Sequence, residues 1–76
     1  MKLPIVKPRE LIKVLEKRGC LFKRQTGSHR IFYYPEKQRI IVVPIHAKEI
    51  KKGLLRSIIK ELDLSVEEFV KLLKRS

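Results

Sequence analysis

The spacing of apolar residues predicts a helix followed by three short strands. After Pro8, apolar side chains recur at helical spacing until a basic residue and a glycine at 18 and 19, so we predict a helix over 8–18. The next three apolar stretches are rich in aromatic and β-branched residues, which favour strands. The strands are predicted over 20–26, 29–34 and 39–44, with turns at 27–28 and 35–38.

The second half of the chain predicts two more helices. Residues 45–52 lack a clean period and are predicted to form a loop, and Gly53 precedes the strongest helical pattern. The apolar stripe of this pattern, which we expect to face the core, consists of Leu54, Leu55, Ile58, Ile59 and Leu62. Ser65 and Glu68 have the spacing of a capping box, which opens a short last helix whose apolar face is Val66, Phe69, Val70 and Leu73.

This order of elements predicts an α+β fold, α-β-β-β-α with a short extra C-terminal helix. Three consecutive strands joined by short turns form an antiparallel sheet, and the helices cover one of its faces. The same order occurs in double-stranded-RNA-binding folds. The length of 76 residues and the lack of a linker or repeat indicate a single domain over 1–76. Since Ile31 and Tyr33 alternate with Phe32 and Tyr34, one apolar set is expected to stay uncovered by the helices.

The chain carries a net charge of +11, and the charge is unevenly distributed. Residues 1–60 contain 16 Lys and Arg and four Glu. Residues 61–76 contain three Lys and Arg and four acidic residues. Such a surface attracts polyanions, and nucleic acid is the first partner it indicates. The alternative is a solvated surface that only keeps the protein soluble.

Other composition features exclude several classes of protein. No apolar run approaches a membrane span and no secretory signal is evident, so we expect a cytoplasmic protein with no membrane partner. The single cysteine, Cys20, cannot form an internal disulfide and is expected to serve packing. Two histidines, one cysteine and one aspartate at scattered positions do not predict a metal site, and nothing indicates a small-molecule cofactor.

His29 is the best candidate for catalysis, because it lies at a glycine turn among cations. An imidazole titrates near neutral pH and is a natural general base for the ribose 2′-hydroxyl in RNA. His46, just after the third strand, lies at the same end of the sheet if strands two and three form a hairpin, and with Ser28 and Gly27 it is a candidate for a substrate or acid role. The alternatives are an ordinary turn hydrogen bond for His29 and a loop position without a special role for His46. The candidates for binding RNA are Lys23, Arg24, Arg30, Lys48, Lys51, Lys52 and Arg56.

The chain resembles the HicA toxins, also called YcfA-like proteins, over about its whole length. The resemblance rests on residues 19–32, which contain Gly27-Ser28-His29, on Pro44-Ile45-His46 and on Lys52-Gly53 at the start of the second long helix. It implies a double-stranded-RNA-binding-like fold and a toxin that cleaves mRNA and blocks translation. It also implies a HicB-type antitoxin that covers the site, and it places the active-site histidine at His29.

Two function classes therefore compete. The first is a metal-independent endoribonuclease of a toxin–antitoxin pair. The second is a non-catalytic module that binds double-stranded RNA through its shape, phosphates and 2′-hydroxyl groups. A basic peptide that lies on membranes fits less well, because the cations are not confined to one face of an amphipathic helix.

Overall fold

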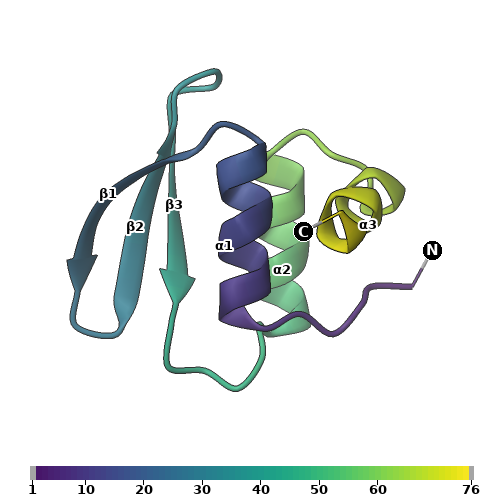
Figure 1. Cartoon of the computed structure of the whole chain (residues 1–76), viewed down its shortest axis with the longest axis horizontal. Coiled ribbons are helices and arrows are strands. Elements are labelled where there is room, and N and C mark those ends of the chain that lie inside the picture. The colour runs from purple at the N-terminus through teal and green to yellow at the C-terminus, as the bar shows by residue number, and fades with distance from the viewer. Residues whose placement is uncertain (1, 76) are drawn as a thin grey trace.

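A computed structural model describes residues 2–75 and contains three strands and three helices (Figure 1). The elements follow in the order α1 (Pro8–Lys17), β1 (Leu21–Thr26), β2 (His29–Tyr34), β3 (Arg39–Pro44), α2 (Lys52–Glu61) and α3 (Val66–Lys74). The strands form one antiparallel sheet in the order β1-β2-β3. This confirms the predicted α+β class and its double-stranded-RNA-binding-like order.

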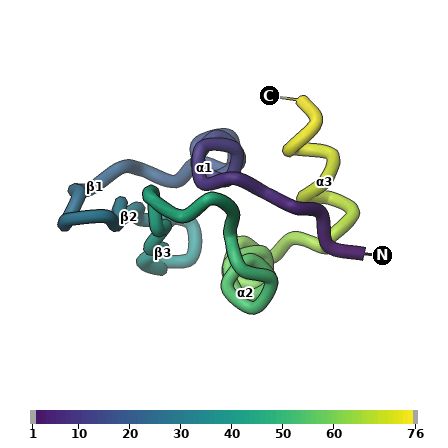
Figure 2. The backbone as a smooth tube through the Cα atoms, turned by 90° about the horizontal axis from the view of Figure 1, so that it is seen from below, coloured from purple at the N-terminus to yellow at the C-terminus, as the bar shows by residue number. Residues whose placement is uncertain are grey.

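The helices lie on one side of the sheet, with β1 farthest from them (Figure 2). Phe32 and Tyr34 of β2 and Ile41 and Val43 of β3 are buried, and they meet the apolar faces of the helices in a single core. Every residue of β1 is exposed. β1 therefore extends past the part of the sheet that the helices cover.

The ends of α1 are set by local hydrogen bonds. Pro8 is its first residue, and the Glu10 carboxylate accepts a hydrogen bond of 2.8 Å from the backbone N–H of Lys7. The N-cap is Lys7 rather than a serine or threonine, and Glu10 supplies the stabilising contact. At the other end Gly19 has a φ of 93°, which favours glycine, and the Cys20 N–H still donates to Leu15 O at 2.9 Å. This bond ties Cys20 to the end of α1, and the strand predicted from residue 20 begins at Leu21.

The start of α2 differs from the prediction. Lys51 is the N-cap, and its carbonyl accepts the first helical hydrogen bond from the Leu55 N–H at 2.9 Å. Lys52 and Gly53 are therefore helical, where the sequence predicted a loop up to residue 52 and a glycine before the helix. Leu54 was expected in the buried stripe but is 37% exposed, because it lies at the rim of the face formed by Leu55, Ile58, Ile59 and Leu62.

The predicted capping box of α3 is confirmed. The Glu68 N–H donates to Ser65 Oγ at 3.0 Å, and the Ser65 N–H donates to the Glu68 carboxylate at 2.8 Å. These bonds hold the pKa of Glu68 below its usual value. Phe69 of α3 is buried in the core, and Lys17 Nζ of α1 donates a hydrogen bond to Leu72 O at 3.1 Å. The C-terminal helix is thus attached to α1 rather than to the sheet.

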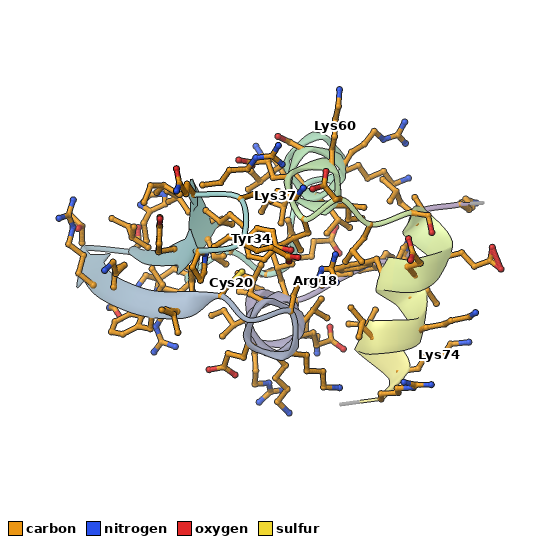
Figure 3. The ribbon with its side chains drawn as sticks, turned by 90° about the horizontal axis from the view of Figure 1, so that it is seen from above. Arg18, Cys20, Tyr34, Lys37, Lys60 and Lys74 are labelled. Atoms are coloured by element: carbon orange, nitrogen blue, oxygen red, sulfur yellow. The ribbon has the colours of Figure 1, made fainter. Side chains whose placement is uncertain are left out.

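Cys20 and Tyr34 lie in the interior, whereas Lys60 projects outward from α2 (Figure 3). The Tyr34 hydroxyl donates a 2.6 Å hydrogen bond to Glu36, and this bond together with burial raises the pKa of Tyr34. Burial also raises the pKa of the Cys20 thiol from 9.0 to about 11, although Arg18 acts in the opposite direction. The burial of Cys20 confirms its predicted packing role.

We expect Cys20 to react slowly with thiol reagents in the folded protein. The thiolate is the reactive form, and the raised pKa lowers its fraction about a hundredfold near neutral pH. The measurement is the rate of reaction with Ellman's reagent at pH 8, with the chain unfolded in guanidinium chloride as the control. Equal rates in the two states would show that the thiol is accessible.

Candidate active site and RNA interface

A two-residue turn, Gly27-Ser28, connects β1 to β2. The strands pair Thr26 with His29 directly across it, and Gly27 has a φ of 58°. A positive φ at the first turn position only is the pattern of a type II′ turn, which favours glycine there. A Cβ atom at Gly27 would meet nothing within 4 Å, so the turn borders open space. A substrate backbone can approach it closely.

His29 lies on the face of the sheet that the helices leave uncovered. Side chains alternate along a strand, and Phe32 and Tyr34 face the core, so His29, Ile31 and Tyr33 face the other way. The side chain is exposed, and within residues 2–75 the imidazole makes no hydrogen bond. The alternative of an ordinary turn hydrogen bond is therefore not found in the described part of the chain.

A backbone hydrogen bond holds the segment that carries His46 beside the same turn. The Ile45 N–H donates to Ser28 O at 2.8 Å, which extends the β2–β3 pairing one step past Pro44. His46 is the next residue and is exposed. The structure thus brings Gly27, Ser28, His29 and the backbone of His46 to one end of the sheet, as the hairpin argument predicted.

The predicted cations do not form one cluster. Lys23 lies at an irregularity in the β1–β2 pairing, with its Nζ 5.5 Å from the centre of the Tyr33 ring. Arg24 pairs with Ile31 and shares the open face with His29. Arg30 instead points to the helix side, where its Nε donates to the Gln25 side chain at 3.1 Å. Lys48, Lys51, Lys52 and Arg56 are exposed on the loop before α2 and on its first turns.

These groups nevertheless lie at one end of the molecule. The β1–β2 turn, the end of β3, the following loop and the start of α2 all lie at the bottom of Figure 1. The loop and α2 are on the far side of β3 from β1. The cations are therefore spread across the whole end, which suits a polyanion better than a single small anion.

Two cations of α1 were not among the predicted site residues. Arg9 and Lys13 lie with Arg30 and Ile45 around a hollow of about 490 Å³ between α1 and the sheet. Their spacing of four residues puts them on one face of the helix, and this signal was available in the sequence. What the sequence did not give was the side of the sheet to which Arg30 points.

Within residues 2–75, no group of three or more His, Cys, Asp or Glu side chains is placed to hold a metal ion. In the same range, no helix is long and apolar enough to cross a membrane.

A small basic α+β domain with a three-stranded sheet, helices on one face and a histidine at a glycine turn falls in the double-stranded-RNA-binding-like class. The sequence matches the family described as HicA toxin of bacterial toxin-antitoxin over residues 8–64, from the start of α1 to the turn after α2. The chain belongs to this HicA toxin family, as the resemblance predicted. Its toxins are ribonucleases, typically mRNA interferases, with a cognate HicB antitoxin. No curated protein matches the sequence.

Proposed function

We propose that the protein is a metal-independent endoribonuclease in which His29 is the general base. The imidazole takes the proton of a ribose 2′-hydroxyl, and the 2′-oxygen attacks the adjacent phosphorus. The bond from phosphorus to the 5′-oxygen breaks, and that oxygen leaves with a proton. The products are a 2′,3′-cyclic phosphate and a 5′-hydroxyl. Because the substrate is mRNA, we place this activity in the cytoplasm.

The observation that carries the proposal is the state of His29 itself. Its side chain is exposed beside an open glycine turn and makes no hydrogen bond within the described chain. Because the ring is exposed and unbonded in this range, its nitrogens are free to contact a substrate, and no buried polar group depends on them. Lys23 and Arg24 extend along the same face and would offset the charge that develops on the phosphate.

We propose His46 as the donor of the proton to the leaving 5′-oxygen. An in-line displacement needs base and acid on opposite sides of the phosphorus, and two separate strand ends can supply them. The bond from Ile45 to Ser28 fixes the backbone of the loop near His29. The exposed side chain of His46 is left to reach the substrate.

Cleavage of end-labelled RNA in excess EDTA tests the enzyme against the non-catalytic binding module. We expect the wild-type chain to cleave and the His29→Ala variant to bind RNA without cleaving it. Binding without cleavage by the wild-type chain would favour the module.

The open face of the sheet is the surface we propose for the antitoxin. Pairing places Leu21, Tyr33 and Ile40 in one row and Arg24, Ile31 and Val42 in the next. Leu21, Ile40 and Val42 are 54%, 55% and 40% exposed. An apolar surface bordered by cations suits an acidic partner with apolar contacts of its own, and binding there would cover His29.

We expect Ile40→Glu to weaken the toxin–antitoxin complex at least tenfold without unfolding the toxin, because it adds a buried charge to an apolar interface. Ile5→Glu is the control, since Ile5 is 73% exposed and lies in the N-terminal segment before α1. Titration calorimetry gives both affinities. If complex formation slows hydrogen exchange only in α3, and exchange in β2, β3 and the His29 turn stays as in the free toxin, the antitoxin binds elsewhere.

A further inference from the structure

A second surface lies on the opposite side of the sheet from His29. The hollow of about 490 Å³ is formed by α1 on one side and by Arg30 and Ile45 on the other. Its size is within the range of about 300–1,000 Å³ that small-molecule sites occupy. The apolar part of the lining comes from Pro8, Ile12 and Ile45, and the charged part from Arg9, Lys13 and Arg30 with one carboxylate, Glu16. Three cations against one carboxylate make this a site for an anion that also carries an apolar part.

Arg30 is held in position toward this hollow. Its Nε donates to the Gln25 side-chain oxygen at 3.1 Å, while the Gln25 side-chain nitrogen donates to Gly27 O at 3.2 Å. The two terminal nitrogens of Arg30 make no hydrogen bond within residues 2–75. A guanidinium fixed at Nε with both terminal nitrogens available is suited to two contacts with one phosphate.

We propose that this hollow binds one unstacked nucleotide of a single-stranded RNA, with the base against Ile12 and Ile45 and the adjacent phosphates at Arg9, Lys13 and Arg30. That this RNA is the strand to be cleaved rests on the proposed function. An apolar surface accepts the face of a base, which is available in a single strand and is stacked in a duplex. The site therefore favours single-stranded over double-stranded RNA.

The nucleotide in the hollow is not one of the two that the cleaved phosphodiester bond joins. Arg30 follows His29 directly, but their side chains point to opposite faces of β2. An RNA strand that reaches both must pass around the Gly27-Ser28 turn, where open space allows it. The hollow thus contributes affinity and position and takes no part in the proton transfers.

The test uses the full chain and a fluorescent 2′-O-methyl RNA octamer, which has no free 2′-hydroxyl and cannot be cleaved. Anisotropy gives the affinity for the single strand and for its duplex. The variant Arg9→Glu/Lys13→Glu reverses two charges at the hollow. Its control, Lys60→Glu/Lys74→Glu, reverses two exposed charges on α2 and α3, which changes the net charge equally. Circular dichroism checks that both variants fold.

We expect the hollow variant to bind the single strand at least tenfold more weakly, and the control to stay within about threefold of the wild type. Ile45→Ser keeps the charge and should also weaken single-strand binding while leaving duplex binding unchanged. With cleavable RNA, the hollow variant should raise KM and keep kcat within about threefold. Equal losses in the two charge variants, or an equal loss for duplex and single strand, would overturn the proposal.

The two proposals can fail separately. If the wild-type chain binds the octamer through the hollow but cleaves no RNA, the ribonuclease mechanism is wrong and the nucleotide site stands. If RNA is cleaved and the hollow variant matches the wild type in both affinity and KM, the nucleotide site is wrong and the mechanism stands.

Discussion

Phe32→Ala should lower the free energy of unfolding by about 3–5 kcal/mol, the usual range for removing a buried phenylalanine ring. Phe32 is 1% exposed in the centre of the sheet, where its ring lies in the core between β2 and the helices. Domains of this size have a total stability of about 5–15 kcal/mol, so this one change would remove a large part of it.

Phe22→Ala is the matched control. Phe22 pairs with Phe32 across the β1–β2 ladder, and their ring centres are 5.9 Å apart in an edge-to-face arrangement. Phe22 is 57% exposed because β1 extends past the helices, so its removal should cost about 0.5–1.5 kcal/mol, the value of such an aromatic pair. Urea unfolding followed by circular dichroism gives both values. Equal losses would mean that β1 is covered in solution.

His29→Ala should slow RNA cleavage by about 10²–10⁴-fold, the contribution of a positioned general base. The side chain is exposed and makes no hydrogen bond within the described chain, so the unfolding midpoint should stay that of the wild type. Initial rates on labelled RNA and a urea titration measure the two effects. A folded variant that cleaves at the wild-type rate would remove His29 from the mechanism.

The two histidines can be told apart by the substrate. Sulfur in place of the bridging 5′-oxygen leaves as a thiolate, which needs no proton because a thiol has a far lower pKa than an alcohol. This substrate should restore most of the rate lost in His46→Ala and none of the rate lost in His29→Ala. If the sulfur-containing substrate restored the rate of His29→Ala instead, His29 would be the general acid and His46 the general base.

The strands were predicted well because their signals are local. Aromatic and β-branched residues with turn residues between them fixed β2 and β3 at the observed bounds. The start of α2 depended on contacts distant in sequence. The Ile50 N–H donates to Val6 O at 2.7 Å, and Ile50 is buried, which holds the chain just before Lys51 begins the helix. The residue types between 45 and 53 do not predict that contact.

In the candidate site, too, the features with a local sequence signal were predictable and those that depend on tertiary packing were not. Gly27-Ser28-His29 is a local pattern, and the structure places its members together at the turn. The sequence predicted two apolar sets on β2 but did not say which set the helices would cover, since Ile31 and Tyr33 are as apolar as Phe32 and Tyr34. That choice puts His29 on the open face and Arg30 toward α1. The hollow lined by Arg9, Lys13 and Arg30 depends on it, and it could not be predicted before the helices were placed.

The most direct test of the mechanism is the chemistry of the ends that cleavage produces in excess EDTA. If His29 activates the 2′-hydroxyl, mass spectrometry will find a 2′,3′-cyclic phosphate, or the phosphate formed from it, on one fragment and a 5′-hydroxyl on the other. RNA with 2′-O-methyl groups will stay intact. Fragments that end in a 3′-hydroxyl and a 5′-phosphate, or cleavage that stops when EDTA is added, would contradict the account.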